Sequence, residues 1–239
     1  MTTAMTAAQI LSEIEPLGTE AYRNILRNHG VTGPIFGVKI EELKKYERKI
    51  KKNYQLALDL YDTGIYDAMY LAGLIADEKK MTKDDIRDWA AKDHTNAVGE
   101  YAVCWVASEG PHGWDLGMEW IESADEQIAV IGWGTLSSVV SVKDDSELDI
   151  PAIRALLKRV TETIHDAPNR VRYKMNGFVI CVGSYVVELT DEAMAAAEAI
   201  GKVTVNMGKT SCKVPFAPEY IRKVEEKGRL GKKRMSARC

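Results

Sequence analysis

Apolar residues recur at intervals of three and four positions through almost the whole chain, as in Ile10, Leu11, Ile14 and Leu17. That spacing places them on one face of an α-helix, whereas a half-buried strand would alternate apolar and polar residues. We therefore expect an all-α protein. The predicted helices cover residues 5–16, 19–29, 40–52, 53–63, 65–77, 82–93, 95–109, 112–122, 125–142, 149–166, 169–187, 190–204 and 216–228.

Capping residues and glycines mark where these helices begin and end. Thr82 with Asp85, and Ser123 with Glu126, have the spacing of a capping box, and Thr190 opens another helix. Short helices joined by tight turns favour helix pairs, with a repeat near the roughly 40 to 47 residues of HEAT and armadillo units. We predict an α-solenoid of degenerate HEAT/armadillo-like repeats over residues 1–228, followed by a basic tail, 229–239.

Two of the predicted helices, around residues 128–140 and 175–187, are apolar nearly all round, which predicts burial on most sides. Glycine destabilises a helix interior, so each glycine in them is expected to permit close approach of another helix or of a ligand. These glycines are Gly132, Gly134, Gly177 and Gly183.

Composition narrows the class of protein. The chain has 239 residues, of which 46% are hydrophobic and 28% charged, typical of a folded protein. Its cysteines, Cys104, Cys181, Cys212 and Cys239, are widely spaced, so we expect no metal site, no disulfide framework and no cofactor. Without a signal sequence or an apolar span, a cytoplasmic or nucleoid location is predicted.

Charge is distributed unevenly along the chain. The net charge is −3, yet residues 222–239 hold eight Lys and Arg against two Glu, while the remainder holds 24 basic and 33 acidic side chains. Attraction to a polyanion must then come from local patches and not from the overall charge. The tail is either a solvated basic segment or part of such a patch, with Lys232, Lys233 and Arg234 at its centre.

Three segments carry candidate chemistry. Gly208-Lys209-Thr210 resembles the end of a phosphate-binding loop, but Val203 stands where that loop needs glycine, which favours a turn at residues 206–208 instead. Glu100 lies among aromatics in a mostly apolar helix, a setting that raises carboxylate pKa values at functional sites; pairing with a lysine or capping of a neighbouring helix is the alternative. Arg170, Arg172 and Lys174 suit phosphate contacts, or form a solvated helix end.

The order and character of several segments resemble the AlkD-type DNA alkylation-repair proteins, which are HEAT-like-repeat bacterial DNA glycosylases. The resemblance is carried by residues 36–43, residues 62–77 and the two buried helices, and it covers roughly residues 20–228. It implies binding to duplex DNA, alkylated at purines, and cleavage of the N-glycosidic bond of N3- or N7-alkylated bases. In that family a carboxylate stabilises the developing oxocarbenium charge while tryptophans pack against the deoxyribose.

Matched residue by residue, the resemblance retains only part of the active site. Glu100 falls where the family has its catalytic aspartate, and Phe178 falls where it has a tryptophan. Asn96 replaces the other active-site tryptophan, and the supporting arginine maps near Ile131 or Gly132. The resemblance implies Glu100 as the acid, with Asn96, Tyr101, Trp105 and Phe178 near the lesion and Arg170, Arg172, Lys174, Lys232, Lys233 and Arg234 on phosphates.

Those substitutions leave three interpretations open: a glycosylase that excises alkylated purines, a DNA-binding relative without catalysis, and a helical scaffold for protein partners.

Overall fold

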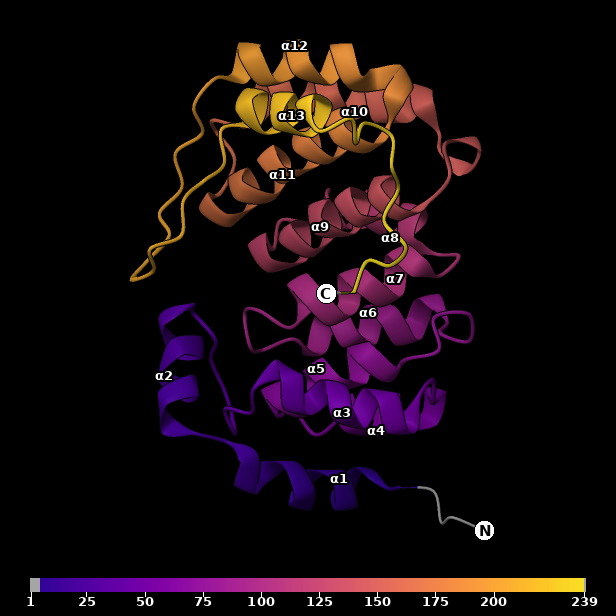
Figure 1. The fold of residues 1–239 in the computed structure, drawn as a ribbon, viewed down its shortest axis with the longest axis vertical. Helices are drawn as coiled ribbons and strands as arrows, with labels where there is room; N and C mark the ends of the chain where they lie inside the picture. The colour runs from indigo at the N-terminus through magenta and orange to yellow at the C-terminus, as the bar shows by residue number, and fades with distance from the viewer. Residues whose placement is uncertain (1–4, 239) are drawn as a thin grey trace. The chain divides into compact units, whose positions relative to one another are not determined.

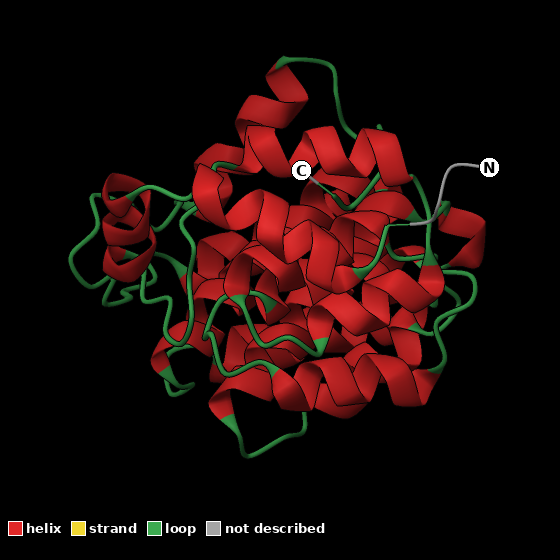
Figure 2. Ribbon diagram, turned by 90° about the horizontal axis from the view of Figure 1, so that it is seen from below, coloured by secondary structure: helices red, strands yellow, loops and turns green. Residues whose placement is uncertain are grey.

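The computed structural model describes residues 5–238, and over that range the chain consists of helices and loops without a strand (Figure 2). Thirteen α-helices lie within the described residues, and all but one match a predicted helix to within a few positions (Figure 1). The exception is the helix predicted over 95–109, of which only Cys104–Glu109 is α-helical. The all-α prediction is therefore confirmed. No described helix is long and apolar enough to cross a membrane, and the described residues contain no cluster of three or more metal-ligating side chains.

The described residues pack into two compact units. The first comprises residues 5–112 together with Gly208–Thr210 and Arg238, and the second comprises residues 113–207 and 211–237. The prediction of one repeat domain over residues 1–228 remains a prediction. Met1–Ala4 and Cys239, which fall within the predicted domain and tail, lie outside the described residues.

The first unit is built around one fully buried helix. Its helices are α1 (Ala7–Ile14), α2 (Glu20–Asn28), α3 (Ile40–Ile50), α4 (Tyr54–Tyr61), α5 (Tyr66–Ile75), α6 (Lys83–Lys92) and α7 (Cys104–Glu109). Every residue of α5 is buried, including Asp67. The Asp67 carboxylate accepts backbone N–H bonds from Phe36 (2.7 Å), Gly37 (3.3 Å) and Val38 (2.7 Å), so it fixes the loop before α3.

An aromatic stack joins α4 to α6 in the first unit. The rings of Tyr61 and Trp89 lie 4.1 Å apart and within 5° of parallel. The Tyr61 hydroxyl donates a 2.8 Å hydrogen bond to the Trp89 carbonyl, which satisfies the polar end of a ring that is otherwise buried.

The second unit contains the two predicted apolar helices. Its helices are α8 (Gly113–Trp120), α9 (Glu126–Val142), α10 (Ile150–Thr163), α11 (Asn169–Tyr185), α12 (Thr190–Ile200) and α13 (Ala217–Glu226). α9 and α11 pack along each other, and they contribute eleven of the 25 buried residues in this unit's core. The expected burial of both helices is confirmed.

The glycines of α9 and α11 divide into two kinds. A Cβ at Gly132 would lie 2.7 Å from the Ile121 amide nitrogen, and one at Gly183 would lie 2.6 Å from the Ile221 side chain. Close helix packing therefore accounts for both glycines, while Gly134 is buried within α9. Gly177 differs, because nothing lies within 4 Å of the position that its Cβ would occupy.

One of the two predicted capping boxes is present. Thr82 and Asp85 hydrogen-bond each other's backbone amides at the start of α6. The Ser123–Glu126 prediction was wrong by two positions, because Asp125 caps α9 and accepts the amides of Gln127 and Ile128. A carboxylate directly before the helix competes successfully with the hydroxyl for this role.

Candidate functional site

Glu100 lies on a short π-helical turn in the first unit, η2 (Gly99–Val103). The buried Asp93 carboxylate holds the start of this turn, accepting the Gly99 amide at 2.7 Å and the Thr95 amide and hydroxyl at 2.9 and 2.6 Å. Turns of this kind are frequent at functional sites. The sequence predicted a regular helix here. The structure has a wider, π-helical turn instead, and Asp93 holds the residue directly before the half-buried Glu100 carboxylate.

Two of the predicted lesion-proximal residues lie together beside Glu100. Tyr101 is 40% exposed, and its ring centroid lies 6.1 Å from Tyr70 and 5.9 Å from Trp105. Trp105 is only 3% exposed, so the exposed Tyr101 ring packs on a buried one. Asn96 is exposed, with a positive φ of 57°, and its side-chain amide donates a long 3.4 Å bond to the Thr32 hydroxyl.

Phe178 belongs to the second unit and is fully buried. Its ring meets the Trp133 ring edge to face, with centroids 5.3 Å apart. A DNA contact by the Phe178 ring would require this packing to open. The structure also places near this pair an arginine that the sequence did not identify: the Arg159 guanidinium, from α10, lies 5.9 Å from the Trp133 ring centroid.

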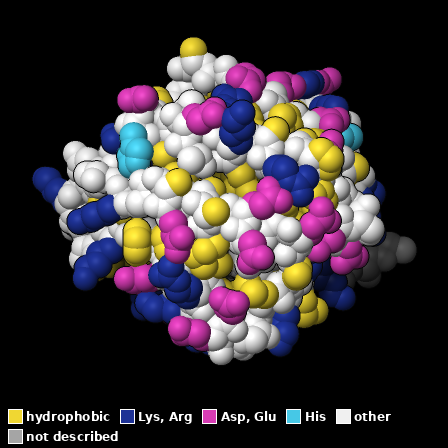
Figure 3. Space-filling model, turned by 90° about the horizontal axis from the view of Figure 1, so that it is seen from above, with side chains coloured by type: hydrophobic (Ala, Val, Ile, Leu, Met, Phe, Trp, Pro, Cys, Tyr) yellow, Lys and Arg dark blue, Asp and Glu magenta, His cyan; other side chains and the backbone are white. Residues whose placement is uncertain are grey.

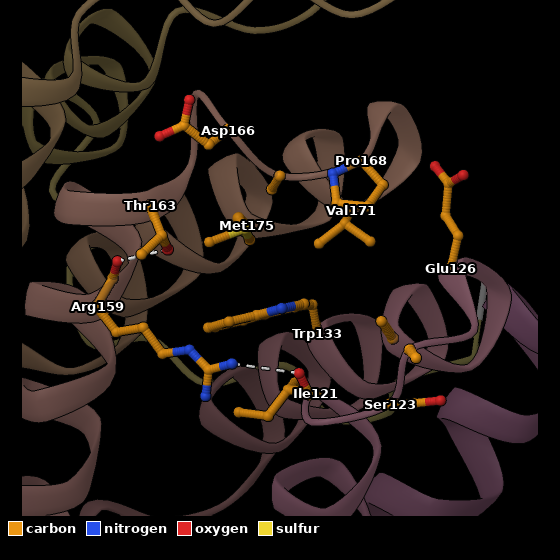
Figure 4. A pocket seen from close by; sticks show the side chains of 13 residues that line it. Ile121, Ser123, Glu126, Trp133, Arg159, Thr163, Asp166, Pro168, Val171 and Met175 are labelled. Carbon is orange, nitrogen blue, oxygen red and sulfur yellow. Dashed lines mark hydrogen bonds between the residues drawn. The ribbon is translucent and has the colours of Figure 1, made fainter.

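A cavity of about 260 Å³ lies next to Trp133 in the second unit (Figure 4). Arg159 reaches into it from one side, and Val171, Met175 and Pro168 line the other. Trp133 and Met175 are 2% and 3% exposed, and the Arg159 guanidinium pairs with the Glu122 carboxylate. The polar and aromatic groups that would recognise a ligand are therefore already engaged by the protein.

The partly exposed side of α11 carries two of the three basic residues predicted on this helix. Its partly exposed positions include Arg170, Tyr173, Lys174, Gly177, Cys181 and Tyr185, which recur at helical spacing along one stripe. We call these six residues the α11 stripe. It spans about 22 Å, from the 1.5 Å rise per residue of a helix. The Arg170 guanidinium packs 5.3 Å from the Tyr173 ring centroid, which orients it at the start of the stripe.

The basic tail is bonded to α11, because the Gly231 amide donates a 2.9 Å hydrogen bond to the Ser184 carbonyl. Burial raises the pKa of the Cys181 thiol, a hydrogen bond with Ser141 lowers it, and the positive charges of Arg234 and Lys174 lower it further. The pKa of Tyr185 is likewise raised by burial and lowered by Arg234 and Arg229. Arg234 is held in place because its amide donates a 2.8 Å bond to the Ser141 carbonyl. The structure therefore places the Arg234 backbone beside Ser141 of α9, the helix that packs along α11 and so along Lys174.

The other predicted basic residues have different surroundings. Arg172 is partly exposed, and its buried Nε has no hydrogen-bond partner among the described residues. Lys232 is exposed. Lys233 is engaged by the Asp145 carboxylate at 2.7 Å and the Val140 carbonyl at 2.8 Å, so a phosphate would have to displace an ion pair there.

Asn206, in the long loop between α12 and α13, is hydrogen-bonded to Asn169, the first residue of α11. The Asn169 side chain accepts the Asn206 amide at 2.8 Å and donates to the Asn206 carbonyl at 3.0 Å. Lys202 and Lys213 of this loop are exposed. The turn predicted at residues 206–208 lies two positions further along the chain, at Gly208 and Lys209, and Gly208 has a φ of 63°.

One face of the molecule is of mixed charge. The face drawn in Figure 3 intersperses Lys and Arg with Asp and Glu and with apolar side chains. Arg170 and Lys174, close together on α11, form a local positive patch on a chain whose net charge is −3.

Comparison with known proteins identifies relatives over nearly the whole chain. Two Listeria proteins, "Uncharacterized protein Lin0241" of Listeria innocua and "Uncharacterized protein Lmo0209" of Listeria monocytogenes, are 35% and 34% identical over 228 residues. Each alignment covers 93% of this chain and 99% of the relative.

A solved structure is also similar, with a TM-score of 0.90 and 34% identity, covering 98% of this chain and 100% of the other. It represents "a new family of proteins related to the HEAT-like repeat DNA glycosylases with affinity for branched DNA structures". This likeness confirms the HEAT-like repeat fold.

The family of DNA alkylation repair enzymes matches residues 10–221. Because the match spans most of the helical chain, and the fold agrees with it, this protein belongs to the DNA alkylation repair enzyme family.

Proposed function

We propose that this protein binds DNA, with branched DNA as its preferred substrate class, and that the cations of the α11 stripe contact the phosphates. The observation that supports this most directly is that Arg170 and Lys174 lie on the partly exposed side of α11, the helix to which the basic tail is bonded through the Gly231 amide and the Ser184 carbonyl. Phosphate contacts by Lys and Arg supply most of the affinity of non-specific DNA binding.

The preference for branched DNA is supported by the similar solved structure, which is related to this chain over its whole length and described as having affinity for branched DNA. The Phe178 and Asn96 substitutions fit a protein selected for binding more than for base excision, because they remove both of the tryptophans that the catalytic relatives place near the lesion.

The test is a binding series with a synthetic four-way junction and a linear duplex of matched arm sequence, followed by fluorescence polarisation. The junction should bind more tightly than the duplex. Its affinity should fall with salt, with a logarithmic slope of about −0.9 per phosphate contacted. Equal affinity for the two DNAs contradicts the preference for branches, and no binding of either at low salt contradicts DNA binding altogether.

Excision of N3- or N7-alkylated purines is a second candidate function, supported by the half-buried carboxylate of Glu100 on its π-helical turn beside the exposed Tyr101. A carboxylate held in place can stabilise a developing positive charge on the sugar. In this proposal Glu100 is the catalytic residue, and it has one methylene more than the aspartate of the catalytic relatives.

Release of free bases from methylated duplex DNA, separated by chromatography, tests this second function. Release of 7-methylguanine or 3-methyladenine that is lost in Glu100→Gln supports a glycosylase. Intact DNA binding without base release contradicts catalysis and leaves the binding function standing. Because Gln retains the size of Glu, a loss of activity in the variant reports the charge and not the packing.

A further inference from the structure

Gly177 has no structural explanation within the described protein. Glycine in a helix interior costs stability, by roughly 1 kcal/mol relative to alanine. At Gly132 and Gly183 the neighbouring helices leave no room for a Cβ. At Gly177 nothing lies within 4 Å of that position, so an alanine would fit without a clash.

The surroundings of Gly177 define the chemistry of whatever approaches it. Lys174 precedes it by three positions on the α11 stripe, and Cys181, on which the charges of both Lys174 and Arg234 act, follows it by four. The bare helix backbone at Gly177 is partly exposed and lies one helical turn from Lys174, and Arg234 follows in the tail, which the Gly231 amide bonds to the Ser184 carbonyl of the same helix. Such a surface matches a polyanion whose chain can come into van der Waals contact with the helix.

We propose that Gly177 is the point of closest approach between α11 and the sugar–phosphate backbone of DNA, and that its missing side chain lets Lys174 and the basic tail reach neighbouring phosphates. This inference rests on the proposed DNA binding. It makes Gly177 a positioning residue, because the hydrogen atom in place of a side chain contributes no charge and no hydrogen bond.

The test compares Gly177→Ala and Gly177→Leu with the native protein, using the four-way junction at a fixed salt concentration. In Gly177→Leu the introduced side chain would hold the DNA backbone away from the helix, so the affinity should fall at least about tenfold, which corresponds to about 1.4 kcal/mol. Gly177→Ala should bind more weakly than the native protein and unfold at a temperature about 2–4 °C higher, because alanine favours the helix. Stability and affinity should therefore change in opposite directions.

Gly177→Lys tests whether close approach of the DNA backbone or local positive charge controls the affinity. If only the local positive charge mattered, Gly177→Lys would bind the junction more tightly than the native protein. Close approach predicts weaker binding despite the added charge. Ala195→Leu, at an exposed position of α12, is the matched control and should leave the affinity unchanged.

The outcomes separate this inference from the proposed function. A native protein that binds the junction while Gly177→Leu binds equally well, or Gly177→Lys binds better, overturns the role of Gly177 and leaves DNA binding intact. A native protein that binds no DNA overturns both. Thermal unfolding of each variant shows whether a weakened affinity comes from a misfolded chain.

Discussion

Individual cations on and beside the α11 stripe differ in their surroundings. Lys174 is partly exposed within the stripe, and Arg234 of the tail is exposed; the charges of both lower the pKa of Cys181. Lys233, the sequence neighbour of Arg234, is instead committed to Asp145 and is only 15% exposed. Adjacent basic residues in the tail therefore have unequal access to phosphates, a difference that their order in the chain does not reveal.

Lys174→Ala should weaken junction binding and make the logarithmic salt slope shallower by about one, because one phosphate contact is lost. A salt series by fluorescence polarisation measures both quantities. Lys158→Ala on α10 is the control: its ammonium group is highly exposed and pairs with Glu162 at 3.9 Å, away from the stripe. An unchanged slope in Lys174→Ala would exclude this lysine from the phosphate contacts.

At the scale of helices, local signals were enough to predict the elements but not their irregularities. The apolar spacing of α9 and α11 predicted their burial, because helical periodicity is a property of neighbouring residues. The π-helical turn at Glu100 depends on Asp93 accepting the Gly99 amide, a contact that no periodicity encodes. The placement of Arg234 beside α9 depends on a backbone bond to Ser141, which is equally invisible in the sequence.

Packing of α9 against the end of α8 predicts the effect of one substitution. Gly132→Ala would bring its Cβ within 2.7 Å of the Ile121 amide nitrogen and 2.9 Å of the Trp120 carbonyl carbon, and backbone atoms cannot rotate away. The free energy of unfolding should fall by about 1–3 kcal/mol, the usual cost of overpacking. Urea denaturation measures this change. Gly177→Ala is the matched control, because it should raise the free energy of unfolding. An unchanged free energy in Gly132→Ala would show that α9 shifts to make room for the methyl group.

At the scale of the whole molecule, Arg238, near the end of the chain, is largely buried and makes several hydrogen bonds and ion pairs. Arg238 is 10% exposed at its side chain, donates to the Gly73 carbonyl at 3.0 Å and the Ala76 carbonyl at 3.2 Å, and pairs with Glu78 at 3.1 Å and with Glu109. A segment predicted to be a tail thus ends in a network of the first unit.

This network predicts how stability depends on acid. Burial tends to raise the pKa of Glu78, but the hydrogen bond from Lys52, the Glu78 amide and the charges of Lys52 and Arg238 lower it to about 2, from an ordinary value of 4.5. The unfolded chain therefore takes up this proton first as pH falls. The stabilisation by Glu78 is complete above about pH 4.5 and is lost progressively towards pH 2.

Denaturation between pH 2 and 6 should show a steeper loss of stability in the native protein than in Glu78→Gln, because the variant has no proton to take up at this position. Glu162→Gln, on the exposed surface of α10, serves as the control. If Glu78→Gln and the native protein lose stability in parallel, the network does not account for the acid sensitivity.

The Tyr61–Trp89 stack has a practical consequence for such experiments. Two nearly parallel rings 4.1 Å apart in a fixed orientation couple their electronic transitions, which should give the folded first unit a distinctive near-ultraviolet circular dichroism band. The second unit holds Trp133 against Phe178 in an edge-to-face arrangement with a different expected band. Circular dichroism spectra of Trp89→Phe and Trp133→Phe would assign each band to its unit. The two bands, followed during denaturation of the native protein, would then show which unit unfolds first, without any attached label.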